Sequence, residues 1–219
     1  MNGFPGSPRV LRGALISMAV AGPPAVVVFQ YNPDSLSRTL VPRSPETGPD
    51  RSQVARLEAP PEETIRLDID LDAADQLGRS DPVATAVGLH PALAALEIML
   101  YPRAAAVIAN EVLSNLGIIE IVPPEAPLTL LVWGPTRIVP VRITELTITE
   151  QAFDPQLNPI RARAGVSARV LTYDDLGLLS PGGAIFMAHQ IVKERMAAIG
   201  TSAGLAAVPS ITGLLPGGS

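Results

Sequence analysis

The run from Ile138 to Phe153 changes the parity of its apolar residues partway along, and no other feature constrains the fold as strongly. Its apolar positions are first odd-numbered and then even-numbered: Val139, Val141, Ile143, Leu146 and Ile148. Successive side chains of a strand point to opposite faces, so one face stays buried through such a change only if an extra residue is inserted. We therefore predict a bulge or sheet corner at Thr144-Glu145, where one strand would serve two sheets of a barrel or orthogonal sandwich. The alternative is that one half of the strand is buried on both faces.

Two further strand-like runs, Leu128–Trp133 and Ile160–Tyr173, flank this one. The turn residues Gly134-Pro135 separate it from the first, and Asp154-Pro155 with Asn158-Pro159 separate it from the second. The last run alternates strictly. One parity is apolar: Ile160, Ala162, Ala164, Val166, Ala168 and Val170. The other is mostly basic or polar: Arg161, Arg163, Ser167 and Arg169. This period of two predicts a strand with one face on a core and the other facing outward.

Thr64–Asp72 alternates in the same way. Its inward set is Ile65, Leu67, Ile69 and Leu71, and its outward set is Arg66, Asp68, Asp70 and Asp72. Acidic residues at every second position suggest calcium, but an EF-hand loop would need Gly where Ala73 stands and Glu where Arg79 stands. The run is therefore interpreted as a strand whose outer face is solvated or lies at an interface.

Composition excludes several classes of protein. Charged residues make up 17% of the 219 residues and hydrophobic ones 47%, which is untypical of a disordered chain. A net charge of −5 with no run of Lys or Arg argues against nucleic-acid binding. Without Cys there are no disulfides, zinc–thiolate sites or thiol catalysis. Few charges and many apolar residues in a loop-rich chain with 23 Pro indicate surface hidden by neighbours, as in an assembly subunit.

The N-terminal third is predicted to contain two strands and a long loop. Leu11–Val20 is interpreted as the first strand, although Ala19-Val20-Ala21 imitates a signal-peptidase site and leaves a cleaved signal as the alternative. Ala25–Tyr31 is the second strand. The segment from Ser35 to Glu63 has no period and is predicted to be a loop that reaches a neighbour in an assembly. No apolar stretch reaches the roughly 20 residues that a membrane span needs.

Helices are predicted between residues 81 and 117 and again near the C-terminus. Asp81-Pro82 and His90-Pro91 are typical helix starts, and a further helix from Ala104 would end before Gly117. A last helix, Ala184–Ile199, would bury a stripe and end at Gly200: Ile185, Ala188, Val192, Met196 and Ile199. Thr201–Ser219 has the composition of a linker or an arm, and we expect Gly200–Ser219 to become ordered only on partners.

No constellation typical of an enzyme is found in the sequence. His90 and His189 are isolated, and satisfied structural roles are the simpler interpretation of both. No serine sits in a nucleophile elbow, and the Gly pairs at Gly182 and Gly217 lack a phosphate-loop frame. Trp133, at a strand end, is interpreted as closing a core rather than as a ligand platform. We therefore expect no enzyme activity, no cofactor and no metal.

Two ordered motifs resemble those of the contractile injection system tube-domain proteins. Phe29-Gln30-Tyr31-Asn32-Pro33 is similar to the family's FQFNP signature. Leu130–Trp133, together with Gly134, is similar to a strand of the family that ends in Trp-Gly. Val141–Phe153 is similar to the strand before its second motif. The residues that match that motif are Phe153, Asn158, Pro159, Ile160, Arg161 and Ala162. Asn158 stands where Gly is usual, and Asn also tolerates positive φ.

The resemblance covers roughly residues 10–175. It implies a mainly β (α+β) fold: a tail-tube-like antiparallel β-barrel or sandwich with one or two helices, in a domain 1–175, followed by a helical extension and arm, 176–219. It also implies a baseplate hub ring of six copies that joins a spike protein to the inner tube protein and contacts other baseplate proteins. Such a particle is assembled in the bacterial cytoplasm, without a signal peptide, and some particles are released.

Two functional questions stay open at this level. Many family members continue into a LysM domain, whereas Ala184–Ser219 stands at that place here, so an inner tube or tube-initiator subunit is an alternative to the hub. A soluble enzyme or ligand-binding domain with no recognisable site is the second alternative. The outward charges, Asp68, Asp70, Asp72, Arg161, Arg163 and Arg169, are expected to pair within a subunit or across the seam between subunits and to fix register. Arginines that line a channel are the competing interpretation.

Overall fold

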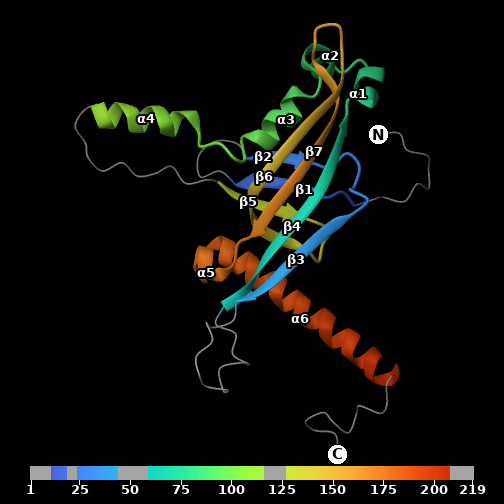
Figure 1. Ribbon diagram of the computed structural model, residues 1–219, viewed down its shortest axis with the longest axis vertical. Helices are drawn as coiled ribbons and strands as arrows, with labels where there is room; N and C mark the ends of the chain where they lie inside the picture. The colour runs from blue at the N-terminus through green and yellow to red at the C-terminus, as the bar shows by residue number, and fades with distance from the viewer. Residues whose placement is uncertain (1–10, 19–23, 44–58, 116–126, 208–219) are drawn as a thin grey trace, which may run out of the picture.

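The structure is a computed structural model, and it describes residues 11–18, 24–43, 59–115 and 127–207. In that part of the chain, seven strands form one antiparallel sheet in the order β2-β1-β5-β6-β7-β4-β3 (Figure 1). The strands are β1 (Ala14–Met18), β2 (Ala25–Val28), β3 (Leu36–Arg43), β4 (Ala59–Asp72), β5 (Leu128–Val132), β6 (Ile138–Phe153) and β7 (Pro159–Val170). The helices are α1 (Ala74–Gly78), α2 (Pro82–Val87), α3 (His90–Glu97), α4 (Ala104–Asn115), α5 (Tyr173–Leu176) and α6 (Pro181–Ala207). This confirms a mainly β (α+β) fold with a C-terminal helix, although the described residues form more helices than expected.

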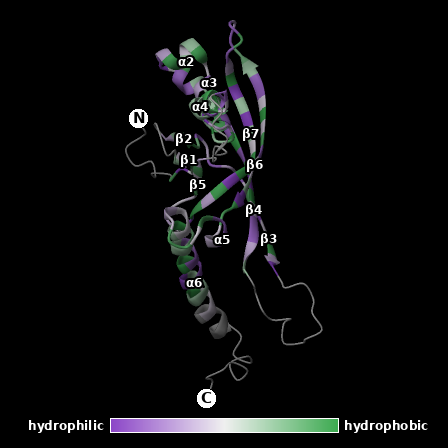
Figure 2. Ribbon diagram, turned by 90° about the vertical axis from the view of Figure 1, so that its left-hand side faces the viewer, coloured by the Kyte–Doolittle hydropathy of each residue, from purple (hydrophilic) through white to green (hydrophobic). Residues whose placement is uncertain are grey.

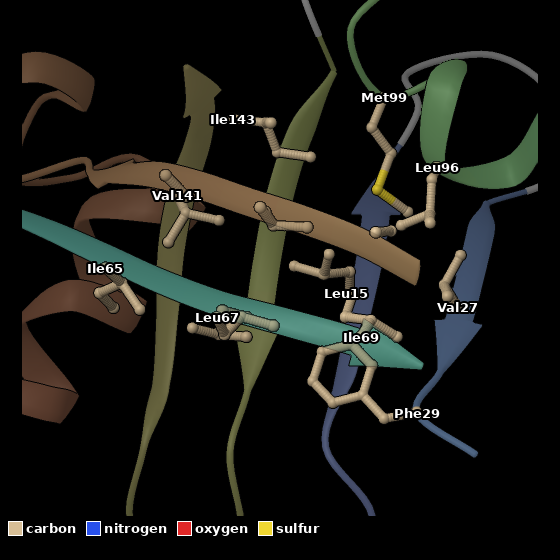
Figure 3. Close-up of a cluster of buried hydrophobic side chains, with 14 of the residues drawn as sticks. Leu15, Val27, Phe29, Ile65, Leu67, Ile69, Leu96, Met99, Val141 and Ile143 are labelled. Atoms are coloured by element: carbon tan, nitrogen blue, oxygen red, sulfur yellow. The ribbon is translucent and has the colours of Figure 1, made fainter. Parts of the chain in front are cut away.

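The predicted bulge in β6 is present, and it folds the sheet over on itself. The register between β6 and β7 shifts between Ile143 and Glu145. Val139 and Val141 are buried before the shift, and Leu146 and Ile148 are partly buried after it. Figure 3 shows the result, with β4 and β7 crossing over β6, β5, β1 and β2. The two halves of the sheet therefore face each other across the core, as in an orthogonal sandwich.

The core lies between the inner faces of these two halves. β4 contributes the four residues expected from its alternation, each at most 5% exposed: Ile65, Leu67, Ile69 and Leu71. The other half contributes Leu15, Val27, Leu131 and Val139, which are equally buried. Alternating hydrophilic and hydrophobic bands along β6 and β7 follow the same period (Figure 2). β4 thus buries mainly one parity, as a strand with one face on a core requires, whereas β5 buries residues of both parities.

Helices contribute side chains to the interior between the two half-sheets. Leu93 and Leu96 of α3, followed by Met99, pack into the hydrophobic core (Figure 3). Phe186 of α6 joins the same core, and its ring lies edge-on to that of Tyr173. The expected start of α2 is confirmed, because the Asp81 carboxylate accepts hydrogen bonds from the amides of the helix's first turn.

The segment from Ser35 to Glu63 was expected to be a loop, and this prediction is wrong for most of its described part. Leu36–Arg43 forms β3, and β4 begins at Ala59. β3 is an edge strand, so most of its side chains are exposed on both faces and show no apolar period. The register skips Pro42, which donates no ladder bond and is readily accommodated at such an edge. Residues 44–58 lie outside the described part.

The predicted buried stripe of the last helix is also wrong. Up to Thr201, where burial is described, its buried residues are Gly182, Gly183, Phe186 and His189. Of the predicted stripe, Ile185 and Val192 are half-buried, and Ala188, Met196 and Ile199 are exposed. A Cβ on Gly182 would lie 2.5 Å from Leu176 Cδ1, so the helix approaches its neighbours closely through its glycines. Apolar periodicity could not reveal a contact face made of glycine and histidine.

Gly200 does not end this helix, which runs on to Ala207. A glycine inside a helix costs only about 1 kcal/mol relative to alanine, so its presence alone does not end a helix. The helix end predicted at Gly200 is therefore wrong, and the expectation that residues from Gly200 onward become ordered only on partners stays a prediction. Residues 208–219 lie outside the described part, as do 19–23, which carry the alternative signal site, and Leu116 and Gly117. The division at residue 175 stays a prediction.

Candidate functional site

The first motif, residues 29–33, ties three separate parts of the chain together. Phe29 is fully buried against Trp133, with ring centroids 6.2 Å apart. This places Trp133 at the core, as expected from its position at a strand end. A Cβ on Gly13 would lie 2.5 Å from Phe29 Cδ2, so only glycine allows the ring to sit there. The aromatic pair thus joins the end of β2, which packs on Gly13 before β1, to the end of β5.

The side chain of Asn32 does more than end a strand, because it links two backbone groups that precede β1. Its Oδ1 accepts a hydrogen bond from the Gly13 amide at 3.0 Å, and its Nδ2 donates one to the Leu11 carbonyl at 2.8 Å. These two bonds satisfy backbone groups that precede the ladder of β1. Tyr31, in contrast, is 56% exposed and packs no core.

Gln30 connects the first motif to the end of β4, where the second motif also arrives. The Asp72 amide donates to Gln30 Oε1 at 2.9 Å. The Asp72 carboxylate accepts from the Ala74 amide at 2.7 Å and from Arg161 Nη2 at 2.7 Å. The Ala73 amide donates to the Ile160 carbonyl at 2.9 Å. Two motifs about 130 residues apart in sequence therefore meet at Asp72, and we call Gln30, Asp72 and Arg161 the motif junction.

The electrostatics of the motif junction favour an ionised Asp72. The amide of Ala74 and then the Arg161 guanidinium hold the pKa of the Asp72 carboxyl below its usual value. The side chains of Arg161 and Asp72 remain 60% and 21% exposed. Arg161 therefore lies on the protein surface and presents much of its guanidinium to the surroundings.

The turn of the second motif is built on Asp154, a residue that sequence reasoning treated only as a breaker. Its carboxylate accepts hydrogen bonds from the amides of Gln156 and Asn158 and from Asn158 Nδ2, each at 2.8 Å. The side-chain amide of Asn158 foremost holds the pKa of Asp154 below its usual value. The suggestion that Asn158 has a positive φ is wrong, because Leu157 adopts φ 65° instead.

The tip of the β6–β7 hairpin packs on the turn between α2 and α3. The Leu89 amide donates to the Pro159 carbonyl at 2.8 Å, and Asn158 Nδ2 donates to the Ala86 carbonyl at 3.3 Å. Gly88 has φ +55°, and a Cβ there would collide with the Pro159 carbonyl oxygen. Asn158 and Pro159 thus hold the helices in place, whereas Phe153 is 47% exposed.

The outward charges pair within the chain at two of the expected places. Arg161 bonds Asp72, and Arg163 Nη2 lies 2.8 Å from Asp68 Oδ2. The hydrogen bond to Asp68, followed by the charges of Asp68 and Asp70, raises the pKa of Arg163. Arg163 and Asp68 are 53% and 55% exposed. This pair is therefore a solvent-screened surface pair.

Arg169 has a different partner from the one expected. It lies 2.7 Å from Asp175 Oδ1 rather than against an aspartate of β4. Asp175 in turn accepts from the Thr172 amide in the capping box that starts α5. Burial acts to raise the pKa of Asp175, but the Thr172 amide and Arg169 hold it below its usual value. Arg169 thus fixes the chain reversal after β7.

A charged cluster beneath α6 was missed by sequence reasoning. Glu63 lies on the inner face of β4 with its side chain 6% exposed, and it accepts from Arg38 Nε at 2.6 Å and from Lys193 Nζ at 3.2 Å. Burial acts to raise the pKa of Glu63, but Arg38 and Lys193 bring it below its usual value. The cluster was missed because Glu63 was assigned to the predicted loop rather than to a strand.

His189, beside this cluster, was expected to be a satisfied structural residue. It is 6% exposed, and neither ring nitrogen forms a hydrogen bond to the described residues. Burial, followed by the charge of Lys193, lowers the pKa of the imidazole, so the neutral ring is favoured. The structure therefore confirms burial, while the backbone of Thr136, which acts to raise the pKa, is close to the ring without forming a hydrogen bond to it by geometry. His90, at the start of α3, is exposed.

The cluster also borders an open cleft of about 500 Å³ between α6 and the β3–β4 edge. Its walls are mostly apolar, with one ion pair at the inner end: Leu40, Pro61, Tyr173, Phe186, Glu63 and Lys193. Among the described residues, no group of three or more His, Asp or Glu side chains is arranged to hold a metal ion.

Comparison with known proteins adds no relationship. No protein-family model matches the chain, and no curated protein sequence matches it. Across the described residues, none of the helices combines the length and the apolar character needed to cross a bilayer.

Proposed function

We propose that the chain is a structural subunit of the baseplate hub of a contractile injection system, and that it forms a ring between the spike and the inner tube. The observation that carries the proposal is the motif junction. Residues of the two family-like motifs bond to the same end of β4, through Gln30 and Arg161 on either side of Asp72. Independent resemblances need not meet in space, so their convergence supports the interpretation of both motifs as parts of one fold.

The surface of the molecule supports an assembly role. Met18, Val26 and Val28 are 45–50% exposed on the β1–β2 half, and Ile108 of α4 is 63% exposed. Neighbouring apolar residues on a monomer's surface mark sites of association. A ring of about six copies, with the spike protein on one side and the inner tube protein on the other, would cover such surfaces. Assembly would take place in the bacterial cytoplasm.

Imaging of the native particle tests the proposal. The chain would carry a small C-terminal tag in the source bacterium, and sheathed particles would be purified and examined by cryo-electron microscopy. We expect density for a ring of this chain, marked by a tag-specific antibody fragment, at the junction of spike and tube. Label along the whole tube would instead identify an inner tube subunit, and particles without label would refute the proposal.

A ligand-binding domain is the second candidate, and the cleft beside α6 favours it. Apolar walls with a few converging polar groups are typical of small-molecule sites. Trp133, the single tryptophan, is not among the residues that line the cleft, so thermal-shift screening of amphipathic small molecules is the suitable assay. A ligand whose stabilising effect is lost in Lys193→Ala would favour this candidate.

A further inference from the structure

Helix α4 presents an apolar face that the rest of the described chain leaves uncovered. None of its residues is buried, and Figure 1 shows the helix standing away from the sheet. Ile108 and Val112, one helical turn apart, are 63% and 52% exposed, and Val107 and Leu113 beside them are 48% and 39% exposed. A helix of 12 residues is marginal in water without packing, so this face requires a partner.

The chemistry of α4 restricts the kind of partner. Glu111 is the single charged residue of Ala104–Asn115, and the helix contains no Lys or Arg. An anionic lipid surface or a nucleic acid would attract basic residues, which this helix lacks. The partner is therefore an apolar protein surface.

The outer face of β1 and β2 is such a surface. Val26 and Val28 are 48% and 50% exposed, and Met18 beside them is 45% exposed. Ile16 lies directly opposite Val26 in the antiparallel register, so it belongs to the same face. Helix on sheet is a standard way to cover an apolar sheet face.

The geometry of the chain directs α4 away from its own copy of this face. Val27, between the two exposed valines, points inward and belongs to the core with Leu96 and Met99 (Figure 3). The α3 segment that precedes α4 thus lies on the inner side of β2, opposite to Val26 and Val28. α4 continues from that inner side, whereas the uncovered valines lie on the outer side.

We propose that α4 of one copy docks, through Ile108 and Val112, on the outer β1–β2 face of a second copy. Each copy then donates a helix and accepts one, which is a heterologous contact that closes into a ring when the rotation between copies allows it. The inference rests on the proposed function only where it places this contact in a ring. The contact between copies stands on the two apolar faces.

Cross-linking tests the contact directly, because the chain has no cysteine of its own. Ile108→Cys and Val28→Cys would be made in two separately tagged full-length proteins, mixed, and treated with a short bismaleimide. Ser114→Cys is the matched control on the other side of α4, and Leu179→Cys, at a 98% exposed position, controls for reactivity. We expect the Ile108–Val28 pair to form the mixed-tag dimer about tenfold more efficiently than either control paired with Val28→Cys, in line with a specific contact.

Three results would overturn the inference. One is a mixed-tag yield no higher than that of the Ser114→Cys control. Another is cross-linking confined to single chains that carry both substitutions, which would mean that α4 covers its own sheet. The third is a wild-type protein that stays monomeric by light scattering at the concentrations used. A ring seen in particles without this cross-link would refute the α4 contact alone, whereas a cross-link in a chain absent from particles would refute the hub proposal alone.

Discussion

The two halves of the folded sheet are alike on their inner faces and opposite on their outer ones. Inside, both contribute buried aliphatic residues to one shared core. Outside, the β4–β7 half carries Asp68, Arg161 and Arg163, whereas the β1–β2 half carries Val26 and Val28. Burial of the core explains the inner faces but requires nothing of the outer ones. In the proposed assembly this difference would follow from the surroundings: water or a polar surface next to one half, and another protein surface next to the other.

The largest effect is expected at the inner face, where the two halves depend on one another. Phe29→Ala removes a fully buried ring from contact with Trp133, and loss of a buried aromatic side chain costs about 3–5 kcal/mol. We expect a single urea transition shifted to lower concentration, because the halves share one core. Tyr31→Ala, two residues away and 56% exposed, is the control and should change stability by about 0.5 kcal/mol at most. Two separate transitions in Phe29→Ala would show that the halves fold independently.

Charges on the two faces of one strand provide the second test. Glu63 is buried on the inner face of β4, and Asp68 is exposed on its outer face. Glu63→Gln leaves Arg38 and Lys193 without their carboxylate, and such a loss costs about 1–3 kcal/mol. Asp68→Asn removes a screened pair worth about 0–1 kcal/mol. Equal losses of stability for both substitutions in chemical denaturation would contradict the distinction between the faces.

Sequence periodicity predicted the parts of the fold where one face is buried and the other is not. The alternation in β4 and β7 and the bulge at Thr144-Glu145 were predicted because burial of one parity leaves a period of two. β3 was missed, since an edge strand with few buried side chains leaves no such period. The contact face of α6 was missed because glycine and histidine carry no apolar signal.

The motif residues were predicted as a set, but not their contacts. That Gln30 and Arg161 would meet at Asp72 depends on how the sheet folds over, and a pattern within single strands contains no information on this crossing. The same limit applies to the Glu63 cluster, whose members come from β3, β4 and α6. Pairing of Arg161 and Arg163 with aspartates was predicted, while Arg169 pairs locally with Asp175.

His189 should make the interface between α6 and the inner face dependent on pH. Its pKa in the folded chain lies below its ordinary value of 6.5, so the unfolded chain binds the proton more readily. Stability contributed by the neutral ring is thus fully present above pH 6.5 and is lost as the pH falls below it. The Tm of the wild type should therefore fall further between about pH 7.5 and about pH 5 than the Tm of His189→Gln, whose side chain does not titrate. Glu63 and other carboxylates titrate in both proteins and cancel in the comparison. Parallel Tm profiles for the two proteins would refute this role.

The smallest effect on the isolated chain, and the sharpest test of the outer faces, concerns Arg161 and Arg163. Both pair within the chain and remain more than half exposed, so Arg161→Glu with Arg163→Glu should cost only about 0–1 kcal/mol for each lost pair, with some added repulsion from Asp68 and Asp72. Around a ring the substitutions recur in every copy, and we expect them to impair assembly if the charges also face a neighbour.

Asp68→Lys with Asp72→Lys in the same chain should restore the intrachain pairs. Recovery of stability without recovery of assembly would assign the arginines to a partner outside the chain. Recovery of both would assign them to register within the sheet. Normal assembly of the reversed protein before any compensation would show that the charged outer face is simply solvated, and that the apolar half alone carries the contacts between copies.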